Sequence, residues 1–347
     1  MRNFNTADLG MRKLAAKLAI TGQLCRSESS RDVSESLGQK RKMESLRVGV
    51  IGYGRMGKMH AANLEALGVQ DVKTVDVGDE YPKKGDVDAL VISSCSSLHE
   101  EHLRVAQQCG GVPVYCEKPL AHTLKASSDC QKLCEASKIP IMLGFQRRFD
   151  QIFARIKSEQ SEQVNPTRNV LIMSRDPQPP SQEYLKRMGS HFMDMTIHDI
   201  DEARLLLDEE PSHVFAHVDS SKMHAFVTMR TPSEKHCQIV NSRHCSFGYD
   251  QRVEVFGDNG RAAVDSLPDD PSAFFAERYG EAYKEAIRVF LRDVVLGNKQ
   301  PPVDAHDAIR AAVIASACER SAQTGMEVRV PQQGEEESAI EQINDTI

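Results

Sequence analysis

Three polar side chains have the types and spacing needed to remove a proton from a hydroxyl group. Asp194 and His198 lie four residues apart in a segment of helical character, which places both on one helix face. A carboxylate there can orient the imidazole and raise its basicity, and an imidazole with an ordinary pKa of about 6.5 suits a general base at neutral pH. Lys118, within Glu117-Lys118-Pro119, ends a predicted strand, and its ammonium group can stabilise a developing alkoxide.

Simpler interpretations of these residues stay open. The Glu-Lys-Pro segment can be a solvated turn, and Asp194 with His198 can be an ordinary helix-surface pair or half of a zinc site. A zinc site would need more ligands, and no second cluster has suitable spacing, so we expect no metal.

A glycine-rich turn follows the first apolar run of strand type. Its six residues match the motif G-x-G-x-x-G, and we expect them to bind a dinucleotide: Gly52, Tyr53, Gly54, Arg55, Met56 and Gly57. The motif alone is weak, but here a strand pattern precedes it and a helical pattern follows. The glycines allow a tight turn, close approach to the pyrophosphate and close helix packing, and the helix N-terminus attracts phosphate. A glycine turn without a ligand is the alternative.

The same type of site needs an acidic side chain roughly 20 residues later, which binds the ribose hydroxyls. Asp76, 19 residues after Gly57, is the candidate and favours NAD, although NADP stays possible and Asp76 can also be an ordinary loop residue.

Strand and helix patterns alternate through the first half of the chain, which indicates a Rossmann-type parallel sheet with crossover helices. Beyond about residue 150, helices and several closely spaced strands predict an α+β domain with a mainly antiparallel open sheet. We therefore divide the chain into a disordered or mitochondrial-targeting extension (1–45), a dinucleotide-binding domain (46–148), a substrate and oligomerisation domain (149–331) and an acidic tail (332–347).

Composition excludes several classes of partner. A net charge of −7 argues against binding nucleic acid or an anionic membrane surface, and no apolar run approaches the roughly 18 residues of a membrane helix. Nine cysteines without a C-x-x-C pair are typical of reduced thiols, so we expect a cytoplasmic protein.

Six sequence blocks, in order, resemble the Gfo/Idh/MocA oxidoreductase family, and most of all its inositol 2-dehydrogenase branch. The blocks are VGVIGYGRMGKMHAANL, VYCEKPLA, GFQRRFD, SRDPQPP, DMTIHDIDEARLLL and NSRHCSFGYDQRVEVFGDNG, and the likeness covers about residues 46–330.

The resemblance implies an NAD(P)-dependent dehydrogenase that oxidises a cyclic polyol. It implies that Lys118, Asp194 and His198 are catalytic and that Asp176 and Tyr249 hold the polyol. It also implies that Arg148 helps to shape the pocket. The cofactor contacts expected from the resemblance are completed by Ser94, His99, Glu117 and Lys118. A dehydrogenase of another sugar, a sugar acid or a dihydrodiol is an alternative, as is a nucleotide-binding regulator without catalysis.

Three departures from the family pattern carry expectations of their own. Only 11 residues separate Asp76 from Asp88, so either the sheet has lost a βα unit or the true second strand is missing. The segment 189–192 is unusual and would bring His191 near the substrate, and the junction at 219–226 is short, as though a hairpin were trimmed.

Alternating residues of the second sheet suggest where subunits associate. We expect the face that carries Val214, Ala216 and Val218 to form a homodimer or homotetramer interface, with helices of the same domain as the alternative cover.

Overall fold

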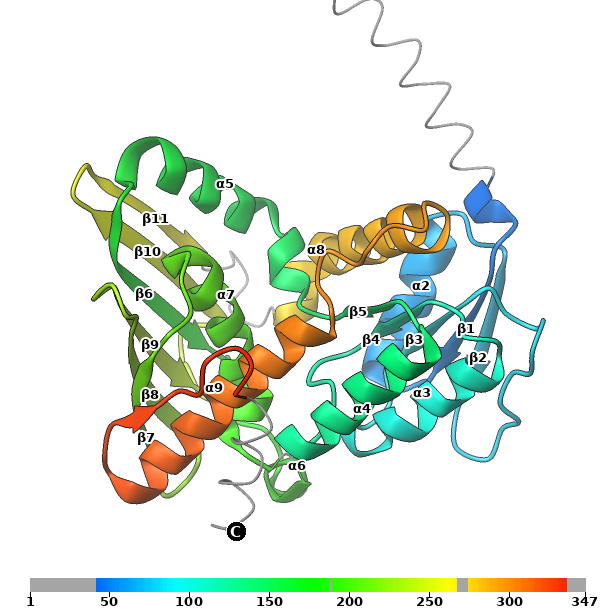
Figure 1. Cartoon of the computed structure of the whole chain (residues 1–347), viewed down its shortest axis with the longest axis horizontal. Helices are drawn as coiled ribbons and strands as arrows, with labels where there is room; N and C mark the ends of the chain where they lie inside the picture. Colours follow the sequence, from blue (N-terminus) through cyan, green and yellow to red (C-terminus); the bar gives the residue numbers. More distant parts are fainter. Residues whose placement is uncertain (1–41, 188, 267–273, 336–347) are drawn as a thin grey trace, which may run out of the picture.

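A computed structural model describes residues 42–187, 189–266 and 274–335, which form two sheets and the helices around them (Figure 1). The extension and the acidic tail predicted at the two ends lie almost entirely outside these residues. The first sheet is parallel, in the order β2-β1-β3-β4-β5. Its strands are β1 (Arg47–Ile51), β2 (Asp71–Val75), β3 (Ala89–Ile92), β4 (Val114–Cys116) and β5 (Ile141–Leu143). All four residues of β3 are buried, as expected for a strand covered on both faces.

The connection between β2 and β3 is the shortened segment. β2 pairs in parallel with β1 at the edge of the sheet, and residues 76–88 contain no helix or strand. The Rossmann order 3-2-1-4-5-6 therefore lacks its outermost strand. The Rossmann-type prediction is confirmed, and of the two explanations for the short segment, loss of a βα unit holds.

Helices cover both faces of the first sheet. One face packs against α3 (His99–Gln108) and α4 (Leu124–Ser137), and the other against α2 (Arg55–Ala66). Residues from α8 (Phe275–Val289) and the helical turn η5 (Phe290–Val295) join α2 in that second apolar cluster. Figure 1 shows α8 beside α2. Part of the later segment therefore covers the earlier sheet, and the division into domains at 148/149 stays a prediction.

The second sheet has seven strands, in the order β11-β10-β6-β9-β8-β7-β12. Its strands are β6 (Thr167–Arg175), β7 (His213–Val218), β8 (His224–Arg230), β9 (His236–Ser242), β10 (Asp250–Gly257), β11 (Arg261–Ser266) and β12 (Val328–Arg329). Every pairing is antiparallel except that of β6 with β9, so the predicted mainly antiparallel sheet is confirmed.

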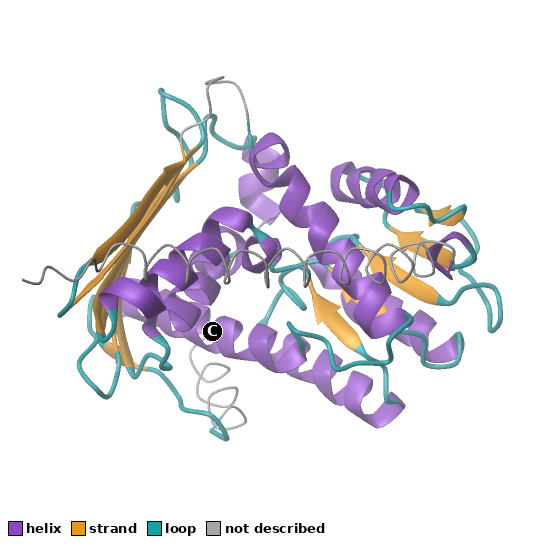
Figure 2. Cartoon of the chain, turned by 90° about the horizontal axis from the view of Figure 1, so that it is seen from above, coloured by secondary structure: helices purple, strands orange, loops and turns teal. Residues whose placement is uncertain are grey.

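Within the part of the chain that the structure describes, the helices lie on one face of this sheet, as Figure 2 shows nearly edge-on. They are α5 (Gln151–Glu159), the helical turn η4 (Phe192–Thr196), α7 (Ile197–Leu207) and α9 (Ala305–Thr324). The short helix α6 (Gln182–Arg187) precedes η4 in the chain. Val214 and Ala216 lie beneath α9 and are about 1% exposed, and the backbone N–H of Ala216 donates to Ser321 Oγ. The predicted interface through these side chains is therefore wrong, and the alternative of cover by helices of the same chain holds.

Candidate active site

A cavity of about 1260 Å³ opens between the two sheets and receives side chains from both halves of the chain. Nine of the residues singled out from the sequence line it: Arg55, Met56, Ser94, Glu117, Lys118, Asp176, Asp194, His198 and Tyr249. The strand ends explain the convergence, because ligands of open parallel sheets bind at the carboxyl ends of the strands.

Lys118 and Asp194 join the two halves directly. Lys118 follows β4, and the peptide bond to Pro119 is cis. The ammonium Nζ donates a hydrogen bond of 2.7 Å to the backbone oxygen of Asp194 and lies 3.9 Å from Asp194 Oδ1. Two segments 76 residues apart in sequence therefore place a cation and a carboxylate at one point of the cavity.

Asp194 is held by two further side chains that the sequence did not reveal. Arg243 Nη2 donates to Asp194 Oδ2 at 2.8 Å, and the Tyr184 hydroxyl donates to Oδ1 at 2.8 Å. Burial alone would raise the pKa of Asp194, but the charges of Lys118 and Arg243 and the Tyr184 hydrogen bond outweigh it and lower this pKa. The carboxylate is therefore ionised at neutral pH.

His198 lines the cavity without a bond to Asp194. Its Nδ1 is buried and has no hydrogen-bond partner among the described residues, and the ring meets the edge of Phe145 at 6.1 Å. Burial, with the charges of Lys118 and Arg147, holds the pKa of His198 well below 6.5. The imidazole is thus neutral at neutral pH, but the expectation that Asp194 orients it does not match the contacts.

Arg147, not Arg148, reaches the cavity. Arg148 forms paired hydrogen bonds with the carboxylates of Asp201 and Asp307 at 2.5–3.1 Å and does not line it. Arg147 lines the cavity and donates to Asp199 at 2.6 Å. The two arginines are neighbours in a short 3-10 turn, so their side chains leave it in different directions. Arg148 therefore lies outside the cavity lining, and its role in shaping the pocket stays a prediction.

Other polar groups that could form hydrogen bonds with substrate hydroxyls line the same cavity as His198. Asp176 follows β6, and its backbone N–H donates to the carbonyl of Ser242. Burial raises the pKa of Asp176 to about 6, against the lowering effect of Arg243. Tyr249, 4% exposed, packs edge-on against Phe274 and Tyr279, and burial raises the pKa of its phenol. His191, in contrast, is bound to the backbone oxygen of Lys222 and does not line the cavity.

The glycine turn has the shape that a diphosphate requires. A Cβ on Gly57 would lie 2.0 Å from the backbone oxygen of Gly52, so only glycine allows helix and turn to meet there. Gly52 has a φ of +90°, and its Cβ would lie 2.5 Å from the Ser94 nitrogen. Gly54 faces open space and caps α2 without any side-chain hydrogen bond, which leaves N–H groups of the first turn available. These residues fit a dinucleotide.

The remaining predicted cofactor residues lie apart from the cavity. Tyr53 follows Gly52 in the turn, and Asp76 is exposed at the end of β2, where the Gly52 N–H donates to the Val75 oxygen. Asp76 is thus beside the glycine turn, and its ribose contact stays a prediction. His99 is 1% exposed and lies 3.1–3.2 Å from the backbone oxygens of Ser94, Pro119 and Leu120. It joins the loops after β3 and β4, and its contact with the cofactor stays a prediction.

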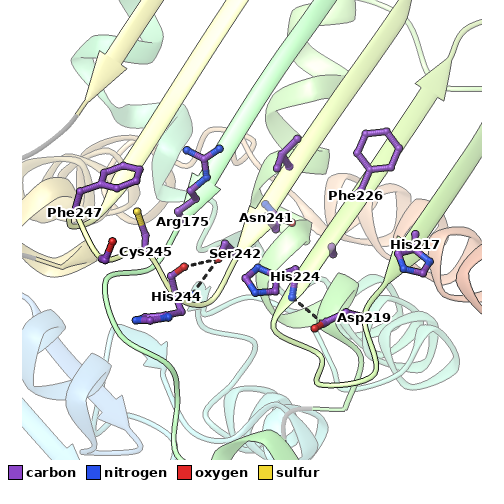
Figure 3. Close-up of a pocket in the computed structure, with 13 residues that line it drawn as sticks. Arg175, His217, Asp219, His224, Phe226, Asn241, Ser242, His244, Cys245 and Phe247 are labelled. Atoms are coloured by element: carbon purple, nitrogen blue, oxygen red, sulfur yellow. Dashed lines mark hydrogen bonds between the residues drawn. The ribbon is translucent and has the colours of Figure 1, made fainter.

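A second cavity lies on the open face of the second sheet (Figure 3). It is lined by Arg175, His217, Asp219, His224, Ala225, Phe226, Val240, Asn241, Ser242, His244, Cys245, Ser246 and Phe247. None of the residues predicted to act in the reaction lines it, so the chemistry belongs to the larger cavity.

A Rossmann-type sheet with a glycine turn, next to a lysine, an imidazole and a carboxylate in one cavity, defines a dinucleotide-dependent oxidoreductase. Two family models match the chain: the oxidoreductase family with an NAD-binding Rossmann fold at residues 65–145, and the GFO/IDH/MocA C-terminal domain at residues 164–263. The chain belongs to the Gfo/Idh/MocA oxidoreductase family.

The sequences of several inositol dehydrogenases align with this chain over nearly their whole length. Myo-inositol 2-dehydrogenase of Thermotoga maritima is 32% identical over 336 residues, which cover 82% of this chain and 98% of that protein. Inositol 2-dehydrogenase of Rhizobium meliloti is 32% identical over 323 residues, with 80% and 97% covered. The crystal structure of a myo-inositol dehydrogenase from Corynebacterium glutamicum matches with a TM-score of 0.74 and 32% identity, covering 83% of this chain and 99% of that one.

Proposed function

We propose that this protein oxidises a secondary hydroxyl of a cyclic polyol of the myo-inositol type to a ketone, with NAD as the hydride acceptor. One observation carries the proposal: Lys118, Asp194 and His198 line a single cavity, with Lys118 Nζ 2.7 Å from the backbone oxygen of Asp194. The names of the relatives support the choice of substrate.

The chain's own residues supply the cofactor site. The free N–H groups at the start of α2 and the open space at Gly54 bind the diphosphate. Asp76 accepts hydrogen bonds from the ribose hydroxyls, which favours NAD over NADP. Glu117 and Ser94 line the part of the cavity next to Lys118. When bound, NAD accepts the hydride that leaves the carbinol carbon.

Proton removal falls to His198. Oxidation takes a hydride from the substrate carbon and a proton from its oxygen, and the neutral imidazole of His198 accepts that proton. Lys118 stabilises the negative charge that develops on the oxygen, because it supplies a cation that its contact with Asp194 holds in the cavity. Asp194 forms ion pairs with Lys118 and Arg243, and its ionised carboxylate can accept hydrogen bonds in the site.

Recognition of the polyol rests on the other polar groups. Asp176, Tyr249 and Arg147 offer acceptors and donors to several ring hydroxyls at once. Gln251 and Tyr283 line the same cavity and complete the polar wall.

We also propose that a second copy of the chain covers the open face of the second sheet, in a homodimer or homotetramer. Phe215, Phe226 and Phe256 stand on that face, 37–42% exposed. Light scattering of the purified protein at micromolar concentration tests this, and a monomer would contradict it.

Localisation in the cytoplasm stays a prediction. It is supported by eight unpaired cysteines among the described residues. Each described helix is too short or too polar to cross a membrane.

The deciding experiment measures NADH formation with myo-inositol and with a panel of sugars, sugar acids and dihydrodiols. Turnover of myo-inositol is expected, and Lys118→Ala should lose activity by orders of magnitude while NADH still binds. NADH binding without turnover of any compound would favour the regulator, which the missing βα unit otherwise motivates. Turnover of another compound alone would correct the substrate class.

A further inference from the structure

The short segment that replaces the missing βα unit makes an unexpected connection to the cavity. Its Tyr81 places Oη 3.1 Å from His102 Nε2, and the two rings meet edge-on with centroids 5.5 Å apart. On the other side of the same imidazole, His102 Nδ1 lies 2.8 Å from Ser94 Oγ. Ser94 lines the cavity, so a continuous chain of polar contacts runs from residue 81 to the proposed cofactor site.

This series of polar contacts ends at the Glu101 carboxylate, which can only accept hydrogen bonds. Tyr81 Oη also lies 3.3 Å from Glu101 Oε1, and a carboxylate has no hydrogen to give. Burial lowers the pKa of His102, which leaves the imidazole neutral, with one N–H.

The direction of every bond follows from these two facts. The phenol of Tyr81 donates to Glu101, so its oxygen accepts from His102 Nε2–H. His102 Nδ1 is then the acceptor, and the hydroxyl of Ser94 donates its only hydrogen to it. The Ser94 oxygen is left with lone pairs alone to present to a ligand.

We propose that Tyr81 and His102 are positioning residues that hold Ser94 as a hydrogen-bond acceptor for an O–H or N–H group of the dinucleotide. The proposal rests on the proposed function, because it takes NAD as the ligand. The segment left after loss of the βα unit thereby supports the cofactor loop. Position favours this role: Ser94 adjoins the glycine turn so closely that a Cβ on Gly52 would meet its backbone at 2.5 Å.

Direct binding of NADH tests the proposal without turnover. The chain contains no tryptophan, so the fluorescence of NADH itself can be followed without protein emission from that residue. One hydrogen bond contributes about 0.5–1.5 kcal/mol, so Ser94→Ala should raise the Kd about 2- to 12-fold. Tyr81→Phe keeps the ring and should raise it about 2- to 5-fold.

The double variant separates positioning from a general structural effect. If Tyr81 acts through Ser94, Tyr81→Phe in the Ser94→Ala background should change the Kd by less than about 1.5-fold. Additive effects, or no effect of Ser94→Ala, would overturn the proposal. Tyr115→Phe is the matched control, because that buried hydroxyl has no partner among the described residues, and its Kd should equal that of the wild type.

A calorimetric titration with ADP-ribose identifies the half of the cofactor that Ser94 contacts. A weakened affinity of Ser94→Ala for ADP-ribose as well as NADH assigns the donor to that half, and an effect on NADH alone assigns it to the nicotinamide; both support the proposal. Failure of the wild type to bind NADH would instead refute the proposed function itself.

Discussion

Substitution of Arg243 by leucine is expected to lower the free energy of unfolding by about 2–3 kcal/mol at neutral pH. Arg243 Nη2 lies 2.8 Å from Asp194 Oδ2, and the two side chains are only 4% and 17% exposed. Removal of one partner from a buried ion pair costs about 3–5 kcal/mol, because the other charge stays buried. Lys118, with Nζ 3.9 Å from the same carboxylate, and the hydroxyl of Tyr184 remain and reduce the loss.

The effect should depend on pH with a defined sign. In the wild type the pKa of Asp194 is lowered, so its contribution to stability is present above the unfolded pKa of about 3.8 and is lost as the pH falls through the folded value. Without Arg243 the folded pKa rises, because burial is less opposed. The difference between variant and wild type should therefore be largest near pH 7 and should narrow toward pH 4.

Urea unfolding followed by circular dichroism at several pH values measures this difference. Arg168→Leu is the control, because Arg168 bonds to Asp258 at 2.7–2.9 Å with both side chains at least half exposed, and its unfolding midpoint should stay at the wild-type value. Equal stability of Arg243→Leu and wild type at pH 7, or a constant difference across the pH range, would refute the reasoning.

Four further substitutions have distinct expected outcomes. His198→Asn should lower kcat about 10²- to 10⁴-fold with an unchanged Kd for NADH in fluorescence titration, because a general base is lost. Gly57→Ala should raise that Kd at least about tenfold, since a Cβ would lie 2.0 Å from the Gly52 oxygen and force the phosphate turn to move. Arg148→Met should cost about 2–4 kcal/mol in urea unfolding but leave the KM for the polyol unchanged. Asp176→Asn should remove an acid limb near pH 6 from the profile of kcat/KM, and a limb that persists would assign it elsewhere.

Local patterns made the first half of the fold predictable. The glycine turn needs only six adjacent residues between a strand and a helix, and β3 is one continuous apolar run. The spacing from Asp76 to Asp88 was too short for a helix and another strand, which predicted that either a βα unit or the true second strand was missing. Such features depend on neighbours along the chain, so sequence reasoning reaches them.

The sequence alone does not show in which direction a side chain points. Arg147 and Arg148 are adjacent and chemically identical, and only the geometry of the turn sends one to the cavity and the other to Asp201. His99 lies in the expected region, but its ring turns into the protein toward three carbonyl oxygens. The inward face of β7 must be apolar both when a helix of the same chain covers it and when a second subunit does. The alternation of apolar residues along β7 therefore could not predict that α9 covers this face.

The contacts of the cavity also explain why two titratable groups can work together at neutral pH. Lys118 affects both groups. Its charge lowers the pKa of Asp194, and it also lowers the pKa of His198, where burial is the larger cause. A cation favours the ionised form of a carboxylate but opposes protonation of an imidazole, so one lysine sets both groups in the form that the reaction needs. Arg243 strengthens the effect on Asp194 and Arg147 that on His198. The second sheet and the turn after β5 thus contribute charge to the site as well as shape.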